Sequence, residues 1–238
     1  MKYLILVLLS LSLPLSSQTL SGKELLDKAI SYHDPNSNWP TFKGEFKVTM
    51  ETPNSSGRES EIRIDLPAEY FSVKATRDTV TTEYELNKSE CKIRLNGLSN
   101  LSEGQLKTNR LSCERANMYK NYYTYLYGLP MKLKDPGTKV HETVERKTFK
   151  NIDYLVLKVT YEEAVGSDIW YFYFNPKTYA MEVYQFYKTD DSGKMNLESG
   201  EYILLSDEEI VNGIKMPKTR AWYYNKDDKY LGTDILNK

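Results

Sequence analysis

Apolar and polar residues alternate with a period of two over much of the chain after residue 40. In residues 41–52, Phe42, Phe46, Val48 and Met50 fall on one face, whereas the other face is mostly charged. This period predicts a β-strand with one buried and one solvated face, which is the pattern of antiparallel sheets.

The same alternation returns between turn-forming residues along the rest of the chain, so it predicts an antiparallel meander. A turn at residues 53–57 joins the first strand to a second at 62–66. Further strands are expected at residues 71–75, 80–86, 93–95, 139–148, 154–161, 168–175, 180–187, 200–205, 209–216 with a turn at 212–213, 219–224 and 230–235. We therefore expect a mainly β (α+β) protein with about eleven strands in a curved sheet or incomplete β-barrel.

The segment at residues 168–175 (DIWYFYFN) departs from simple alternation because both of its faces are apolar. Such a strand needs cover on both sides.

Two segments have a helical pattern instead. Ser21 and Glu24 match a capping box, in which each side chain bonds a free backbone N–H at a helix start. Residues 21–33 place their apolar side chains on one helical face, and Pro35 ends the helix. Residues 114–129 carry tyrosines on two helical faces. We expect this second helix to pack in the mouth of the sheet, on its concave side, between two surfaces.

The first 18 residues are typical of a secretory signal peptide. Lys2 supplies a positive start, residues 3–13 are an apolar run too short to span a bilayer comfortably, and residues 14–17 form a small, polar exit. We expect cleavage near Ser17 or Gln18 and a periplasmic or secreted protein with one domain over residues 19–238. No cysteine lies near the exit for lipid attachment, so we expect neither a lipid nor a transmembrane anchor.

Charge excludes two classes of partner. The 238 residues have a formal net charge of −1 with interleaved signs. This is not the footprint of a nucleic-acid-binding protein, and it lacks the basic face of a peripheral membrane binder.

Cys91 and Cys113 are the two cysteines of the chain. In an exported protein they are candidates for one intrachain disulfide, which would stabilise the fold by ~3 kcal/mol. Two free, half-buried thiols are the alternative, because sequence does not show how close the two residues lie.

Candidates for catalysis and metal binding are weak. His141 begins a His-Glu-x-x segment, but the second histidine of the zinc motif is absent and the segment is typical of a strand. His33 precedes Asp34 at the expected helix end, where the helix dipole favours a histidine. No G-x-S-x-G elbow is present. We therefore expect no catalytic residues, no metal and no cofactor.

Large aromatic residues exceed what a one-sided sheet needs. They either fill a sandwich core or line a cavity for an apolar ligand. On the second interpretation, the candidate ligand contacts are Trp39, Phe46, Met50, Tyr84, Tyr122, Trp170, Phe172, Phe174, Tyr184 and Trp222.

Three segments suggest a family. They are residues 39–46 (WPTFKGEF), 170–178 (WYFYFNPKT) and 210–218 (IVNGIKMPK). With the order of elements, they make the chain resemble the lipoprotein-carrier (LolA/LolB-like) superfamily, and within it an uncharacterised family of exported bacterial proteins. The resemblance implies an incomplete barrel around a helical plug, with an apolar cavity for acyl chains.

These observations lead to two main functional hypotheses, and a hydrolase of unrecognised type is a third. The first is an exported, non-enzymatic binding protein for a lipid or other apolar ligand, which carries it across the periplasm. The second is a structural or protein-interaction module of the cell envelope, with a filled core and an envelope protein as partner.

Overall fold

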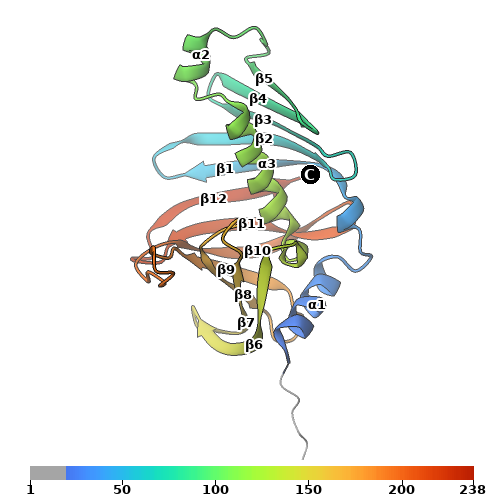
Figure 1. Cartoon of the computed structure of the whole chain (residues 1–238), viewed down its shortest axis with the longest axis vertical. Helices are drawn as coiled ribbons and strands as arrows, with labels where there is room; N and C mark the ends of the chain where they lie inside the picture. Colours follow the sequence, from blue (N-terminus) through green and yellow to red (C-terminus); the bar gives the residue numbers. More distant parts are fainter. Residues whose placement is uncertain (1–19) are drawn as a thin grey trace, which may run out of the picture.

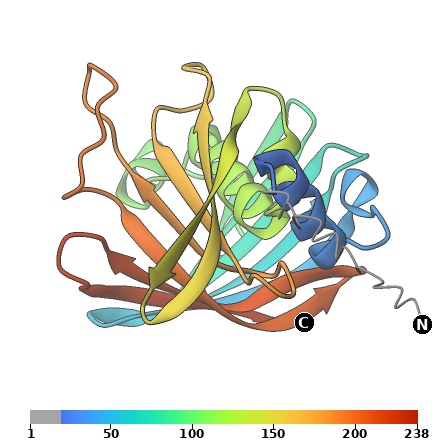
Figure 2. The ribbon, with the colours of Figure 1, turned by 90° about the horizontal axis from the view of Figure 1, so that it is seen from below.

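The computed structural model describes residues 20–238; the expected signal peptide at residues 1–18 lies outside them. One antiparallel sheet of twelve strands, in the order β5-β4-β3-β2-β1-β12-β11-β10-β9-β8-β7-β6, forms the body of the molecule (Figure 1). The sheet is open, with β5 and β6 at its edges, and it curves around the helices (Figure 2). The expected fold class is confirmed.

Strand bounds follow the alternation of the sequence closely. The strands are β1 (Lys43–Thr52), β2 (Ser55–Asp65), β3 (Tyr70–Arg77), β4 (Val80–Asn87), β5 (Glu90–Leu95), β6 (Thr138–Phe149), β7 (Ile152–Tyr161), β8 (Ile169–Phe174), β9 (Met181–Tyr187), β10 (Glu201–Val211), β11 (Ile214–Tyr224) and β12 (Tyr230–Asn237). β10 and β11 are longer than the separate short strands expected at residues 200–224, and the Asn212–Gly213 turn joins them, with both residues at positive φ.

The helices are α1 (Gly22–His33), α2 (Glu103–Thr108) and α3 (Cys113–Gly128), with short 3₁₀ turns η1 (Trp39–Thr41) and η2 (Met131–Lys134). α1 begins with the expected capping box between Ser21 and Glu24. It packs chiefly against the edge strand β6, where Gly22 lies against the His141 carbonyl. α2 was not expected. It has no buried residue, so it lacks the apolar period that the prediction relied on.

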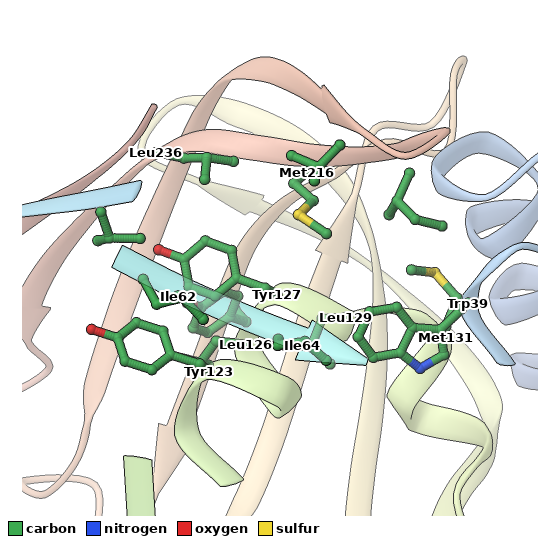
Figure 3. Close-up of a cluster of buried hydrophobic side chains, with 14 of the residues drawn as sticks. Trp39, Ile62, Ile64, Tyr123, Leu126, Tyr127, Leu129, Met131, Met216 and Leu236 are labelled. Atoms are coloured by element: carbon green, nitrogen blue, oxygen red, sulfur yellow. The ribbon is translucent and has the colours of Figure 1, made fainter. Parts of the chain in front are cut away.

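α3 lies on the concave side of the sheet, as expected from its tyrosines on two faces. Its N-cap is Ser112, whose side chain accepts a hydrogen bond from the Arg115 backbone. Tyr123 and Tyr127 are buried against the sheet, and Figure 3 shows them beside Ile62. The helix therefore fills part of the space that the curved sheet encloses.

Gly128 ends α3 where the chain passes Trp39. A Cβ at this position would lie 2.2 Å from Trp39 Cζ2, so glycine is required for the close approach of the helix to η1. Trp39 in turn packs on Phe42, with ring centroids 5.2 Å apart. This contact joins the start of the sheet to the end of the helix.

The apolar pattern of β8 is explained by two separate clusters. Its inward residues join the main core under α3, whereas Tyr173 joins a smaller buried cluster on the outer face with Tyr154, Val156 and Val183. Phe149 packs against this outer cluster, with its ring 5.3 Å from that of Tyr173. Both faces are covered, as the sequence predicted.

Within residues 20–238, no helix is both long enough and apolar enough to cross a bilayer.

Candidate functional site

The inner face of the sheet beneath α3 is where the predicted ligand contacts meet. All ten come from strands, from η1 or from α3, and nine of them belong to the main core or pack against it. Six are buried, namely Trp39, Phe46, Tyr84, Phe172, Phe174 and Tyr184. The other four, Met50, Tyr122, Trp170 and Trp222, are half-buried.

The buried members pack on the helix or on each other. The Phe46 ring lies 4.8 Å from that of Tyr127, and the Tyr84 ring lies 5.6 Å from that of Tyr119. These contacts hold α3 to β1 and β4. A ligand could meet Phe46 or Tyr84 only after the helix moved, so the role predicted for them stays a prediction.

Four half-buried aromatic residues and the buried Tyr184 form a continuous row, which we call the aromatic stripe: Tyr122, Trp222, Tyr184, Trp170 and Tyr125. Successive ring centroids lie 6.3, 6.2, 6.1 and 5.7 Å apart. The stripe begins and ends on α3 and crosses β11, β9 and β8 between. It offers a nearly apolar wall with few polar atoms, of the kind that lines ligand sites.

A cleft of about 770 Å³ opens beside this stripe, at the solvent side of α3. Trp170, Tyr125 and Tyr161 line it, and Tyr125 and Tyr161 hydrogen-bond through their hydroxyls. Leu66 and Val165 add apolar surface, whereas the remaining lining, which includes Lys120, Lys132 and Asp168, is largely polar. Burial raises the pKa of Tyr125 well above its usual value and that of Tyr161 to about 12, so both hydroxyls stay protonated at neutral pH.

Sequence analysis missed Tyr125 and Tyr161 as site residues. Tyr125 is one of several tyrosines on the α3 segment, and nothing in its spacing separates it from its neighbours. Tyr161 ends a predicted strand, where the alternation no longer tells which face it takes. Only the contact between α3 and β7 brings the two hydroxyls together.

A buried polar group also lies on the inner face. Arg220 of β11 is opposite Asp234 of β12 in the sheet register, and both are buried. Arg220 donates hydrogen bonds to the carbonyls of Pro217 and Leu126, and its guanidinium lies 3.9 Å from the centre of the Tyr127 ring. Asp234 accepts a hydrogen bond of 3.0 Å from the Tyr122 hydroxyl.

Burial dominates the acid–base behaviour of this group. It raises the pKa of the Asp234 carboxyl above its usual value, although Tyr122, Arg220 and Arg58 oppose the shift. Sequence analysis did not single out these charged residues, yet counting the period of two would have placed Arg220 and Asp234 on the inner face.

The two histidines lie apart from this site. His33 is buried between α1 and the sheet, where both ring nitrogens contact backbone groups. His141 is half-buried on β6, with Nε2 3.3 Å from Thr160 Oγ1. Among residues 20–238, no group of three His, Cys, Asp or Glu side chains is placed to hold a metal.

Comparison with solved structures identifies the fold class. The chain is similar to a LolA superfamily protein, NE2245 from Nitrosomonas europaea, with a TM-score of 0.54, 13% identity, and coverage of 92% of this chain and 93% of that one. The open sheet around a central helix is therefore a LolA-like fold. The chain itself belongs to a family of unknown function (DUF6503), whose model matches residues 1–237.

Two weaker structural matches have TM-scores below 0.5 and support no further conclusion. A DUF1329 family protein from Desulfovibrio piger matches with a TM-score of 0.45, 9% identity and 90% coverage of both chains. MucB in complex with MucA(peri) matches with a TM-score of 0.25 and 9% identity over 90% of this chain and 92% of that one. A search among curated proteins finds no match.

Proposed function

We propose that the protein is an exported, non-enzymatic binding protein for an acyl chain or similar apolar ligand, which it carries between membranes of the cell envelope. The observation that carries this proposal is the aromatic stripe under α3, with Trp170 and Tyr125 open to the 770 Å³ cleft. Such a volume falls within the range of small-molecule sites.

The energetics support chain binding without chemistry. Burying about 300 Å² of acyl chain at about 25 cal/mol per Å² contributes several kcal/mol before the entropic cost of association. The polar groups at the rim of the cleft can stay in water while the chain lies on the stripe.

The second candidate is an envelope module that binds a protein and no lipid. It is favoured by the burial of six of the ten predicted contacts, which leaves less open apolar surface than an empty barrel would have. The two candidates differ in whether the purified protein takes up an apolar molecule.

Titration with a fluorescent fatty-acid probe tests the proposal. We expect a saturable signal, accompanied by a change in tryptophan emission, because Trp170 and Trp222 belong to the stripe. Trp170→Ala should weaken probe binding about tenfold or more, since it removes the largest apolar surface of the cleft.

Tyr171→Ala is the matched control. Tyr171 is the next residue of β8, is half-buried, and packs against the outer cluster instead of the core. Its removal should leave probe affinity unchanged. If well-folded wild-type protein gives no saturable signal with any of several lipid classes, the envelope-module function replaces this proposal.

A further inference from the structure

Arg58 occupies an unusual place on the inner face of the sheet. On β2, Ser60, Ile62 and Ile64 point inward and are buried, and the period of two puts Arg58 on the same face. It pairs with Met50 of β1, which sequence analysis placed on the inner side. Arg58 is therefore a charged residue at a position where the alternation of β2 predicts an apolar one.

The guanidinium of Arg58 is poorly satisfied by the protein. Nη1 donates to the Tyr119 hydroxyl at 3.4 Å and Nη2 to the Tyr123 hydroxyl at 3.3 Å, both long for such bonds. Nε is buried and has no partner. Within residues 20–238, no carboxylate oxygen lies within 4.0 Å of an Arg58 nitrogen.

Two further arginines lie near it. Arg77 ends β3 on the inner face, one residue beyond the Glu59–Thr76 pair, and its Nε is also buried without a partner. Arg115 of α3 stands over the Tyr119 ring at 5.6 Å, and Arg58 stands over the same ring at 5.7 Å. We call Arg58, Arg77 and Arg115 the arginine cluster.

With respect to stability alone, the arginine cluster destabilises the fold. Like charges on neighbouring strands destabilise a sheet, and a buried guanidinium nitrogen without a partner, such as Nε of Arg58 or Arg77, destabilises it further. The carboxylate of Asp234 lies nearby, but it is opposite Arg220 and accepts the hydrogen bond of Tyr122. A charged side chain at an inward position that the chain compensates only in part is expected at a functional site.

The cluster adjoins both the aromatic stripe and solvent. The rings of Tyr119 and Tyr123 lie 6.2 Å apart, and that of Tyr123 lies 5.2 Å from Tyr122, the first residue of the stripe. Arg115 also borders a hollow of about 740 Å³ between α2 and α3. The arginine cluster is therefore joined to the stripe through packed tyrosine rings and reaches solvent through Arg115.

We propose that the arginine cluster binds the anionic head, a carboxylate or a phosphate, of an amphiphile whose apolar chain lies on the aromatic stripe. Guanidinium groups bind such oxyanions through paired, charge-assisted hydrogen bonds. This inference rests on the proposed function and adds a charged anchor, which the apolar contacts by themselves do not require.

Competition against the fluorescent fatty-acid probe tests this proposal. Three of the competing ligands share one chain length, and the fourth is inorganic phosphate. Dodecanoate and dodecyl phosphate carry the oxyanion, dodecanol has the chain without the charge, and inorganic phosphate has the charge without the chain. We expect the two anionic amphiphiles to bind at least about tenfold more tightly than dodecanol, and inorganic phosphate to compete weakly.

Arg58→Gln should remove this preference while dodecanol binding stays unchanged, and Arg77→Gln should reduce it. Arg77→Gln also provides the test if the first variant does not fold, which circular dichroism will show. The matched control is Arg63→Gln. Arg63 lies on the same strand but on the outer face, paired with Glu45, so its removal should leave the preference intact.

The outcomes separate the two proposals. Equal binding of dodecanoate and dodecanol by the wild type, or a preference that survives in both cluster variants, overturns the anionic subsite and leaves the apolar binding function standing. Failure of every amphiphile to displace the probe from the stripe removes the proposed function and the subsite together.

Discussion

At the scale of single residues, His33 joins three elements of the fold. It is the last residue of α1, and its Nδ1 lies 2.7 Å from the Lys215 carbonyl of β11, while Nε2 lies 2.9 Å from the Met181 backbone nitrogen of β9. Nε2 accepts from that N–H and Nδ1 donates to the carbonyl, so the ring is neutral. His33 lies at the end of a helix, as expected from the sequence. Its side chain contributes to the fold through these two contacts with backbone groups.

This arrangement predicts destabilisation in mild acid. Burial lowers the pKa of His33 below its ordinary value of 6.5, so the unfolded chain takes up the proton first. The contribution of His33 to stability is complete above about pH 6.5 and is lost as the pH falls through and below that value. The free energy of unfolding, measured with urea between pH 7.5 and 5.5, should decrease in the wild type.

His33→Ala should be less stable at pH 7.5 and should show a weaker pH dependence. His141→Ala is the comparison variant because that histidine is only half-buried on β6. It should retain most of the wild-type dependence. Parallel decreases in the wild type and in His33→Ala would contradict the assignment.

At the scale of elements, the position of α3 decides what the site can do. Cys91 of β5 and Cys113, the first residue of α3, form a disulfide with a Cα–Cα distance of 5.9 Å. The bond holds the start of the helix to the edge strand β5 of the sheet. At the other end, Gly128 lets the helix approach Trp39. The helix is thus held over the stripe at both ends.

Removing the disulfide should therefore loosen the helix and lower stability. The double variant Cys91→Ser, Cys113→Ser should lose ~3 kcal/mol of unfolding free energy in urea, because the bond closes a loop in the unfolded chain. Thiol labelling of the denatured, non-reduced wild type should find no reactive thiol. Two reactive thiols per chain would show that the bond does not form.

At the scale of the whole molecule, an oxidising compartment suits both the disulfide and the N-terminal segment. We expect the chain to be exported and cleaved near Ser17 or Gln18, because residues 1–18 have the layout of a signal peptide. Sequencing the N-terminus of protein recovered from the producing cell measures this directly. A mature chain that still begins at Met1 would exclude cleavage.

The sequence by itself determined the elements and their faces. The strands have a period of two and the capping box of α1 satisfies backbone groups within the first turn, and both are local effects of chain geometry. The six-residue α2 was missed because it buries nothing, although Ser102 and Gln105 form a capping box that could have revealed it. Residues that face inward, Arg58 among them, could be found by counting along a strand.

Only the tertiary structure decided what those inward residues meet. Phe46 and Trp170 look alike in the sequence, since each is a large aromatic residue in a predicted strand. One is covered by Tyr127 and the other borders an open cleft, because α3 crosses the sheet over the first and leaves the second partly exposed. In the same way, the two tyrosine hydroxyls that Arg58 meets come from α3, which is distant along the chain. Whether an inward side chain is covered, and whether its charge has a partner, depends on contacts between residues distant along the chain. The period of two within one strand does not encode these contacts.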